Sequence, residues 1–264
     1  MPELPEVETI VRFLNPVLSG RKILDVEIFY PRVIHPLTVP EDLKRKIIGR
    51  KIQRVERAGK NIVLNLSDGN RVLFHLMMTG KLFWNPKGKR KHDRLCLFFS
   101  GGEKLIFNDI RQFGFCRALG SKEEISSPDF LQISLADFRK KTEKTERKVK
   151  TFLLDQKKAS GIGNIYADEI LWEASVDPRR PVKSLNVKEV KKIFLAARKI
   201  LKLAIKKGGT SSRDYRKPDG SKGGYYEFRK AYQRTGEKCR RDGEFIKKIT
   251  VGGRSTHFCP RHQK

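Results

Sequence analysis

A chain of 264 residues, of which 38% are hydrophobic, can form one large domain or two of ordinary size. Its 58 lysines and arginines exceed the 30 acidic residues, and the formal net charge of +28 favours a polyanionic partner, nucleic acid first and an anionic membrane surface second. The sequence excludes a membrane span of about 18 apolar residues, a secretory signal and, with four cysteines, a disulfide framework.

The first predicted element is an amphipathic helix at residues 5–18. The opening letters MPELPEVET hold two prolines and three glutamates, which are favoured in a first helical turn. Pro16 leaves the end of the helix open, because proline kinks or ends a helix. The apolar residues of one face recur at three- and four-residue spacing: Val7, Ile10, Val11, Leu14 and Leu18.

From about residue 22 to 119 the pattern predicts short strands. The runs KILDVEIFY, NIVLNL, RVLFHL, DRLCLFF and EKLIFN are rich in β-branched and aromatic residues, and the turn sequences SDGN, NPKGK and SGGE separate them. Short strands at this spacing predict a β-sandwich or a barrel. Residues 121–136 are polar and irregular, which is typical of a linker.

Helical periodicity follows the linker, and it predicts helices at 146–158, 164–174 and 186–207. The letters ASGIGNIYADE between the first two permit a sharp glycine turn before Asn164. Such a turn can bind phosphate, although an ordinary packed connection fits the same residues. The basic runs RKKTEKTERKVK and KKGGTSSRDYRK are each typical of a solvated surface, and only the charge of the whole chain favours DNA binding.

The C-terminal tail holds four residues that can bind a metal. Cys239 and Asp242 have the spacing C-x2-D, Cys259 and His262 have the spacing C-x2-H, and sixteen residues separate the pairs. The intervening letters EFIKKITV and RSTHF predict a β-hairpin. Cysteine, histidine and aspartate all bind tetrahedral zinc, and a metal-free hairpin with two unrelated cysteines fits the spacing equally well.

Taken together, these segments resemble the formamidopyrimidine-DNA glycosylases. MPELPEVETI, HLMMTGKL, DIRQFGF, GIGNIYADE and the C-terminal hairpin occur in the family's order over essentially the whole chain. The resemblance implies an α+β fold. It places an N-terminal β-sandwich flanked by helices at 1–120, the linker at 121–136, a helix–two-turn–helix domain at 137–229 and a zinc-finger hairpin at 230–264.

The resemblance also implies one structural zinc ion. Its ligands would be Cys239, Asp242, Cys259 and His262, although the family usually has cysteine at all four positions. His257 is a further candidate ligand, because strand alternation places it on the same face as Cys259.

The implied enzyme is a bifunctional DNA glycosylase and AP lyase. It would flip oxidised purines, such as 8-oxoguanine and formamidopyrimidines, out of double-stranded DNA and excise them. Without Met1, Pro2 is a secondary amine whose pKa of about 8 suits attack on the sugar C1′ and a Schiff base, followed by β,δ-elimination. Glu3 would transfer protons, and Glu6 would support it.

The remaining roles also follow from the resemblance. Lys60, in AGKNI, matches a catalytic lysine that touches phosphate and assists elimination, and Arg254 matches an arginine that holds the phosphates beside the lesion. The residues at phosphate-binding positions are His92, Arg111, Lys150 and Asn164. Those that fill the space left by the flipped base are Met78, Arg111 and Phe113. Without the resemblance, Lys60 fits a solvated strand end and Phe113 fits a core position.

Two other functions stay open. One is an endonuclease VIII-like glycosylase for oxidised pyrimidines. The letters MPELPEVET and the lid-like loop YRKPDGSKGGYYEF favour the purine enzymes over this alternative. The other is a non-catalytic DNA-binding homologue. The presence of the residues that match catalytic positions argues against it: Pro2, Glu3 and Lys60. We expect a monomer that does not contact membranes and lies in the cytoplasm, on the nucleoid in a prokaryote.

Overall fold

The computed structural model describes residues 1–264 except 89, 126–128 and 144, so part of the predicted linker lies outside the described residues. Contacts divide the chain into two units. The first comprises Met1–Ser126 and Lys207–Gly224, and the second comprises Ser127–Lys206 and Tyr225–Lys264. Segment 207–224, which the resemblance places in the helix–two-turn–helix domain at 137–229, therefore packs in the first unit. No helix among the described residues is long and apolar enough to cross a membrane.

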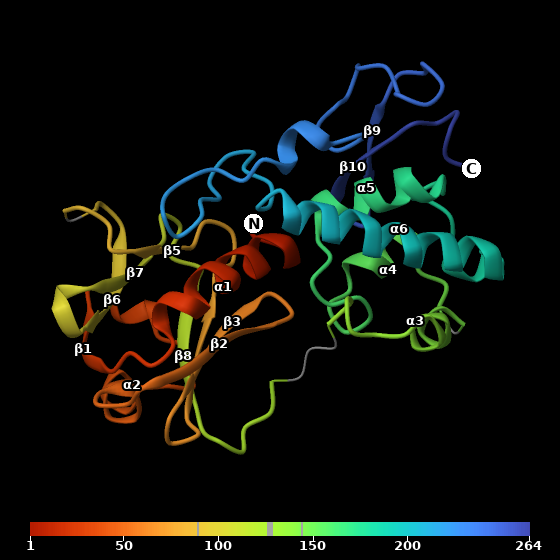
Figure 1. The fold of residues 1–264 in the computed structure, drawn as a ribbon. Coiled ribbons are helices and arrows are strands. Elements are labelled where there is room, and N and C mark those ends of the chain that lie inside the picture. Colours follow the sequence, from red (N-terminus) through yellow and green to blue (C-terminus); the bar gives the residue numbers. More distant parts are fainter. Residues whose placement is uncertain (89, 126–128, 144) are drawn as a thin grey trace. The chain divides into compact units, whose positions relative to one another are not determined.

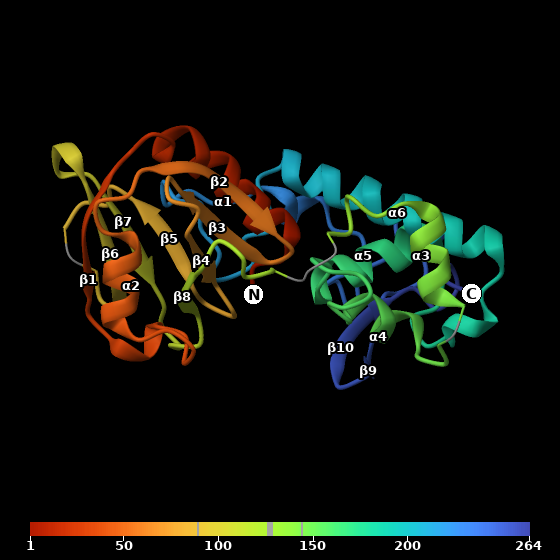
Figure 2. The same cartoon turned by 90° about the horizontal axis from the view of Figure 1, so that it is seen from below.

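The first unit contains two antiparallel four-stranded sheets (Figures 1 and 2). One has the strand order β1 (Ile23–Ile28), β6 (Asp93–Phe99), β7 (Lys104–Asn108) and β5 (Lys81–Trp84). The other has the order β2 (Ile52–Ala58), β3 (Asn61–Leu66), β4 (Arg71–His75) and β8 (Phe115–Leu119). Apolar side chains from both sheets form one core, in which the rings of Phe74 and Phe107 lie 5.7 Å apart. The fold is thus the predicted sandwich.

Two helices complete the apolar core of this sandwich. Helix α1 (Leu4–Leu18) packs on β2 and β3, and it confirms the predicted N-terminal helix. Pro16 lies inside α1 without ending it. Helix α2 (Pro40–Ile47), which contacts β1 and β8, was not predicted, because only Leu43 and Ile47 of its residues are buried and two apolar positions define no period.

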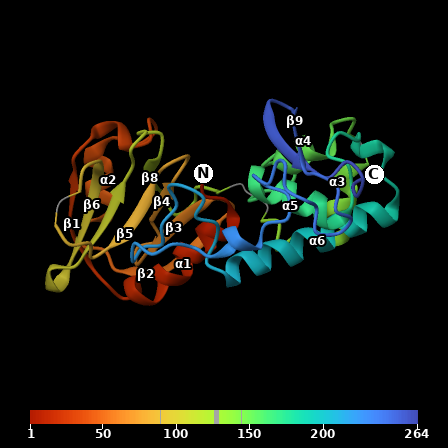
Figure 3. The same cartoon turned by 90° about the horizontal axis from the view of Figure 1, so that it is seen from above.

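The second unit is helical (Figure 3). Its helices are α3 (Leu135–Thr142), α4 (Val149–Leu154), α5 (Asn164–Ala174) and α6 (Val187–Lys206). Helix α5 is almost wholly buried and contacts α4, α6 and strand β10 (Arg254–Phe258). Helix α4 is shorter than predicted because the chain after Leu154 forms a turn in which Lys158 and Ala159 donate to the Asp155 carbonyl.

The predicted C-terminal hairpin pairs β9 (Lys247–Val251) with β10, and Arg254 lies opposite Val251. Gly252 and Gly253 make its turn with φ of 56° and 73°, a conformation that favours glycine. A Cβ atom on Gly252 would lie 2.7 Å from the Thr151 hydroxyl oxygen. The turn therefore packs closely on α4.

Candidate functional site

The start of α1 concentrates buried acidic groups. Glu3 is the N-cap residue and Pro2 precedes it, and both are buried. The Glu3 N–H donates to Glu6 Oε2 at 2.8 Å. In return, the Glu3 carboxylate accepts the backbone N–H of Glu6, and the two hydrogen bonds form a capping box. Pro2 thus lies at the end of the helix where the dipole is positive.

The second carboxylate oxygen of Glu6 holds the segment that returns to this unit. Glu6 Oε1 accepts the Thr210 N–H at 2.7 Å, and the Tyr215 hydroxyl donates to the Glu6 carbonyl at 3.4 Å. Gly209 has φ of +80°, and a Cβ atom there would lie 2.8 Å from Glu6 Oε1. Glu6 therefore joins the first turn of α1 to residues 209–215.

Lys60 lies in the turn between β2 and β3 and is 9% exposed, so it is not a solvated lysine at a strand end. Burial, and secondarily the positive charge of Lys60, lower the pKa of His75 to about 4. The His75 Nδ1 accepts the Met77 N–H at 3.1 Å, and its ring stacks on Phe115. His75, which was not predicted as a site residue, therefore stays neutral at physiological pH and adds no charge beside Lys60.

Three side chains predicted to fill a space in DNA lie exposed on two loops. Met78 is 38% exposed and Phe113 is 51% exposed, so Phe113 is not a core aromatic. The Arg111 guanidinium lies 4.8 Å from the centre of the Phe113 ring. Exposed large apolar side chains grouped with a cation are typical of a contact surface rather than of a core.

Asp109 links these two loops, and it was not predicted as a site residue although it begins the letters DIRQFGF. Its buried carboxylate accepts the Thr79 hydroxyl and the backbone N–H groups of Arg111 and Gly114. The Asp109 N–H in turn donates to the carbonyl of His92, which has φ of +76°. One buried acid thus places His92 and both exposed loops relative to one another.

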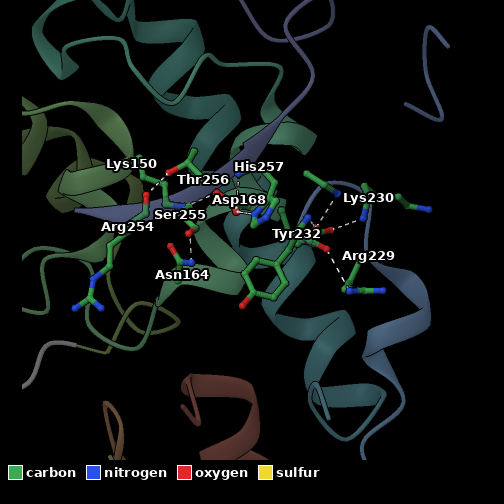
Figure 4. Close-up of polar contacts among 12 residues, drawn as sticks. Lys150, Asn164, Asp168, Arg229, Lys230, Tyr232, Arg254, Ser255, Thr256 and His257 are labelled. Carbon is green, nitrogen blue, oxygen red and sulfur yellow. Dashed lines mark hydrogen bonds and ion pairs between the residues drawn. The ribbon is translucent and has the colours of Figure 1, made fainter. Parts of the chain in front are cut away.

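In the second unit, two predicted phosphate-binding residues converge on one carbonyl oxygen (Figure 4). Asn164 Nδ2 donates to the Ser255 oxygen at 3.0 Å, and Lys150 Nζ donates to it at 3.4 Å. Lys150 is fully buried and forms an ion pair with Asp168. Asn164 and Arg254 instead line a pocket of about 370 Å³, together with Tyr232, Gln233, Lys248 and His257.

Three of the four predicted metal ligands are clustered. Donor atoms of Cys239, Asp242 and Cys259 all lie within 4.8 Å of one another, a donor set that fits zinc. His262 is not part of this cluster, and its Nε2 lies 2.8 Å from the Trp172 carbonyl oxygen. The spare candidate His257 is also elsewhere, because its Nδ1 lies 2.9 Å from Asp168 Oδ2.

Three family models match the chain in order. They are the formamidopyrimidine-DNA glycosylase N-terminal domain at residues 1–116, the formamidopyrimidine-DNA glycosylase H2TH domain at 126–216 and the zinc finger found in FPG and IleRS at 236–263. Two curated relatives are formamidopyrimidine-DNA glycosylases of Carboxydothermus hydrogenoformans, 41% identical, and Streptococcus mutans, 38% identical. Each match covers 100% of this chain and of the relative.

Solved structures show the same similarity over the full length. A complex of a mutant Lactococcus lactis FPG with DNA containing Fapy-dG has a TM-score of 0.93 and 36% identity, covering 100% of both chains. A MutM complex with DNA containing carbocyclic 8-oxo-G has a TM-score of 0.92 and 37% identity, also covering 100% of both chains.

Proposed function

Since this chain belongs to the formamidopyrimidine-DNA glycosylase family, we propose that Pro2 is the nucleophile with which it acts on DNA. Pro2 becomes the N-terminal residue once Met1 is removed. The chain is a DNA glycosylase and AP lyase that excises oxidised purines. One observation carries the assignment of the nucleophile. Pro2 immediately precedes the buried Glu3–Glu6 capping box at the N-terminus of α1.

The chemistry follows from the secondary amine. An α-amino group has a pKa of about 8, and the positive end of the α1 dipole favours its neutral, nucleophilic form. The nitrogen lone pair forms a bond to C1′ as the C1′–N bond to the damaged base breaks, and the departing base takes up a proton. After the amine proton is lost, the nitrogen lone pair forms a double bond to C1′ as the C1′–O4′ bond breaks; O4′ is protonated, the sugar ring opens and an iminium results. The iminium withdraws electrons from C2′, so a proton can leave there and the 3′ phosphate is expelled; a second elimination expels the 5′ phosphate.

Glu3 is the group that we assign to proton transfer. It is adjacent to Pro2 in sequence, and its carboxylate is held by the capping box. A fixed carboxyl group at this position can protonate the departing base or accept a proton from C2′. Glu6 supports it indirectly, because its two oxygens fix Glu3 and residue 210.

Lys60 and Arg254 are the cations that we assign to the eliminations. Both phosphates that leave are anionic, and a lysine in a buried turn or an arginine at the start of β10 stabilises the charge as it develops. His92, Arg111 and Asn164 would bind further backbone phosphates. Lys150 is too deeply buried for direct contact with phosphate, and we assign it to holding Ser255 beside Arg254.

Trapping of the covalent intermediate with borohydride tests this function. Processed protein is incubated with duplexes containing 8-oxoguanine or thymine glycol and reduced with borohydride. We expect a covalent adduct that forms faster on the 8-oxoguanine duplex and whose DNA maps to the peptide beginning at Pro2. An adduct on thymine glycol alone would indicate the pyrimidine activity, and no adduct on either duplex would indicate a binding protein.

We propose that Phe113, Met78 and Arg111 occupy the space that the flipped base leaves. Phe113→Ala should slow excision of 8-oxoguanine about 10- to 100-fold, because stacking of a base on an aromatic side chain is worth about 1–3 kcal/mol. Single-turnover excision measures the effect. Leu195→Ala, which truncates a side chain of similar exposure on α6, is the control and should match wild type. Equal rates for Phe113→Ala and wild type would remove Phe113 from this role.

The finger has one structural zinc site, as its family model and the Cys-Asp-Cys cluster indicate. We propose that His262 turns from Trp172 to become the fourth ligand. Wild-type protein purified without added metal should then contain one zinc ion, and Cys259→Ala should contain less than about a tenth of an equivalent. A chelator should remove zinc from His262→Ala faster than from wild type. Elemental analysis measures the content.

Cys96→Ala is the matched control for the zinc experiment, because this cysteine is buried in β6 of the sandwich and should not affect zinc. Zinc that resists the chelator equally well in His262→Ala and in wild type would show that another group is the fourth ligand.

We also propose that the enzyme acts as a monomer in the cytoplasm, on the DNA of the nucleoid. Its relatives named above are bacterial, and its net charge of +28 suits a partner that is a long polyanion. Light scattering should give the mass of one 30.5 kDa chain, and a dimer mass would contradict the monomer.

A further inference from the structure

Two consecutive buried carboxylates on α5 each bind a different part of the zinc-finger segment. Figure 4 shows one of them, Asp168, beside His257. Asp168 is 1% exposed and Glu169 is 0% exposed, in a helix whose other residues are mostly apolar. Consecutive residues of a helix point about 100° apart, so one turn of α5 can reach two chain segments. The energetic cost of burying two acids requires that both be well bonded.

Glu169 binds the segment that leads into the finger. Its Oε1 accepts the N–H groups of Ala231 at 2.9 Å and Tyr232 at 2.8 Å, and its Oε2 accepts the N–H of Lys230 at 2.8 Å. Burial raises the pKa of Glu169, and these three donors oppose the rise. Three consecutive backbone donors on one carboxylate fix the path of the chain between η4 (Tyr225–Phe228) and the hairpin.

Asp168 binds the returning strand, β10. Its Oδ2 accepts the His257 N–H at 3.0 Å and lies 2.9 Å from Nδ1 of the same residue. Its Oδ1 pairs with Lys150, whose ammonium also reaches the Ser255 carbonyl. Asn164 donates to that carbonyl from the first position of α5. β10 is thus held at Ser255 and at His257, directly after Arg254.

The two anchored segments meet at the pocket that contains Arg254. Tyr232, whose N–H is held by Glu169, has its ring 5.3 Å from the ring of His257, which is held by Asp168. Both residues line the same pocket as Arg254 and Asn164. Each anchored segment continues to ligands of the zinc site: Cys239 and Asp242 follow residues 230–232, and Cys259 follows His257.

We propose that Asp168 and Glu169 are positioning residues that fix the two segments of the finger on α5. They thereby hold Arg254 in the position from which it can stabilise the departing phosphates. The proposal rests on the function assigned above to Arg254. The zinc closes the base of the finger, whereas the two carboxylates determine where its hairpin lies on the helical unit. Both carboxylates are buried, so this role requires no direct contact with DNA.

The test is a double-mutant cycle with Asp168→Asn and Arg254→Ala in the holoenzyme, measured as the single-turnover rate of strand cleavage at an abasic site. We expect Asp168→Asn to slow cleavage at least about fivefold when Arg254 is present and to have little effect when it is absent, since coupled residues are not additive. Effects that simply multiply would overturn the proposal. No effect of Arg254→Ala alone would instead refute the function assigned to Arg254.

Hydrogen exchange shows directly whether the segments are anchored. Asp168→Asn should speed exchange at residues 255–257, and Glu169→Gln should speed it at 230–232, each at least about tenfold and with zinc content unchanged. Glu146→Gln, at an exposed acid paired with Lys183, is the control. The double variant Lys150→Met with Asp168→Asn keeps the test valid if an unpaired buried lysine prevents folding, because it removes the charge as well. Unchanged exchange in the variants at both segments would overturn the proposal.

Discussion

Protein that keeps Met1 should neither cleave DNA at an abasic site nor form a borohydride-trapped adduct, whereas processed protein does both. The peptide bond to Met1 turns the nitrogen of Pro2 into an amide, whose lone pair is delocalised into the carbonyl group and is not nucleophilic. Removal of an enzyme's nucleophile typically lowers the rate by several orders of magnitude. We therefore expect a loss of at least about 10³-fold.

The measurement needs two preparations that differ only at the N-terminus and whose masses are verified. Each is tested for cleavage and, as the control, for binding to a duplex that contains a stable abasic-site analogue. Binding should differ little, because the residues assigned to phosphate contacts are unchanged. Rapid cleavage by protein whose mass includes Met1 would exclude Pro2 as the nucleophile.

Glu3→Gln should lower the rate of 8-oxoguanine excision by about 10²- to 10⁴-fold, the usual contribution of a general acid or base. The amide keeps an acceptor for the capping box, so we expect α1 to remain intact and stability to change little. Cleavage of a preformed abasic site should fall less, because there is no base to expel. The ratio of the two single-turnover rates therefore identifies the step that uses the carboxyl group.

Glu8→Gln is the matched control for this experiment. Glu8 is on the same helix and forms ion pairs with Arg12 at 2.7 Å and Arg57 at 2.8 Å, but it lies beyond the capping box. Its removal should affect stability more than catalysis. If Glu3→Gln slowed both reactions by the same factor, the Glu3 carboxyl group would not act specifically in the departure of the base.

Regular patterns in the sequence sufficed for the main architecture. The apolar spacing of α1 and the β-rich runs that became β3 and β6 locate these elements closely. Helices α2 and α3 were missed because each has eight residues and buries only two of them. The end of helix 146–158 was misplaced because the turn after Leu154 depends on hydrogen bonds to Asp155, which periodicity does not reveal.

Polar residues that act through buried contacts were harder to predict than those that match a motif. Asp109, Asp168 and Glu169 stand inside or beside recognised motifs, yet their partners lie in other loops and strands and can be identified only after folding. Lys150 shows the converse case. Its position in a basic run suggested a solvated or phosphate-binding side chain, and its burial depends on Asp168 in the next helix.

The return of segment 207–224 to the first unit sets a schedule for synthesis. Glu6 and Thr210 are 204 residues apart, and Tyr215 belongs to the core that α1 begins. At about 5–20 residues per second, a ribosome needs roughly 10 to 40 seconds to supply these partners after Glu6 has been made. Throughout that interval the nascent N-terminus lacks the contacts that later bury its first turn. Methionine excision can therefore act on an open chain, and Pro2, the nucleophile that we propose, becomes the N-terminus before the contacts of residues 210 and 215 with the first turn have formed.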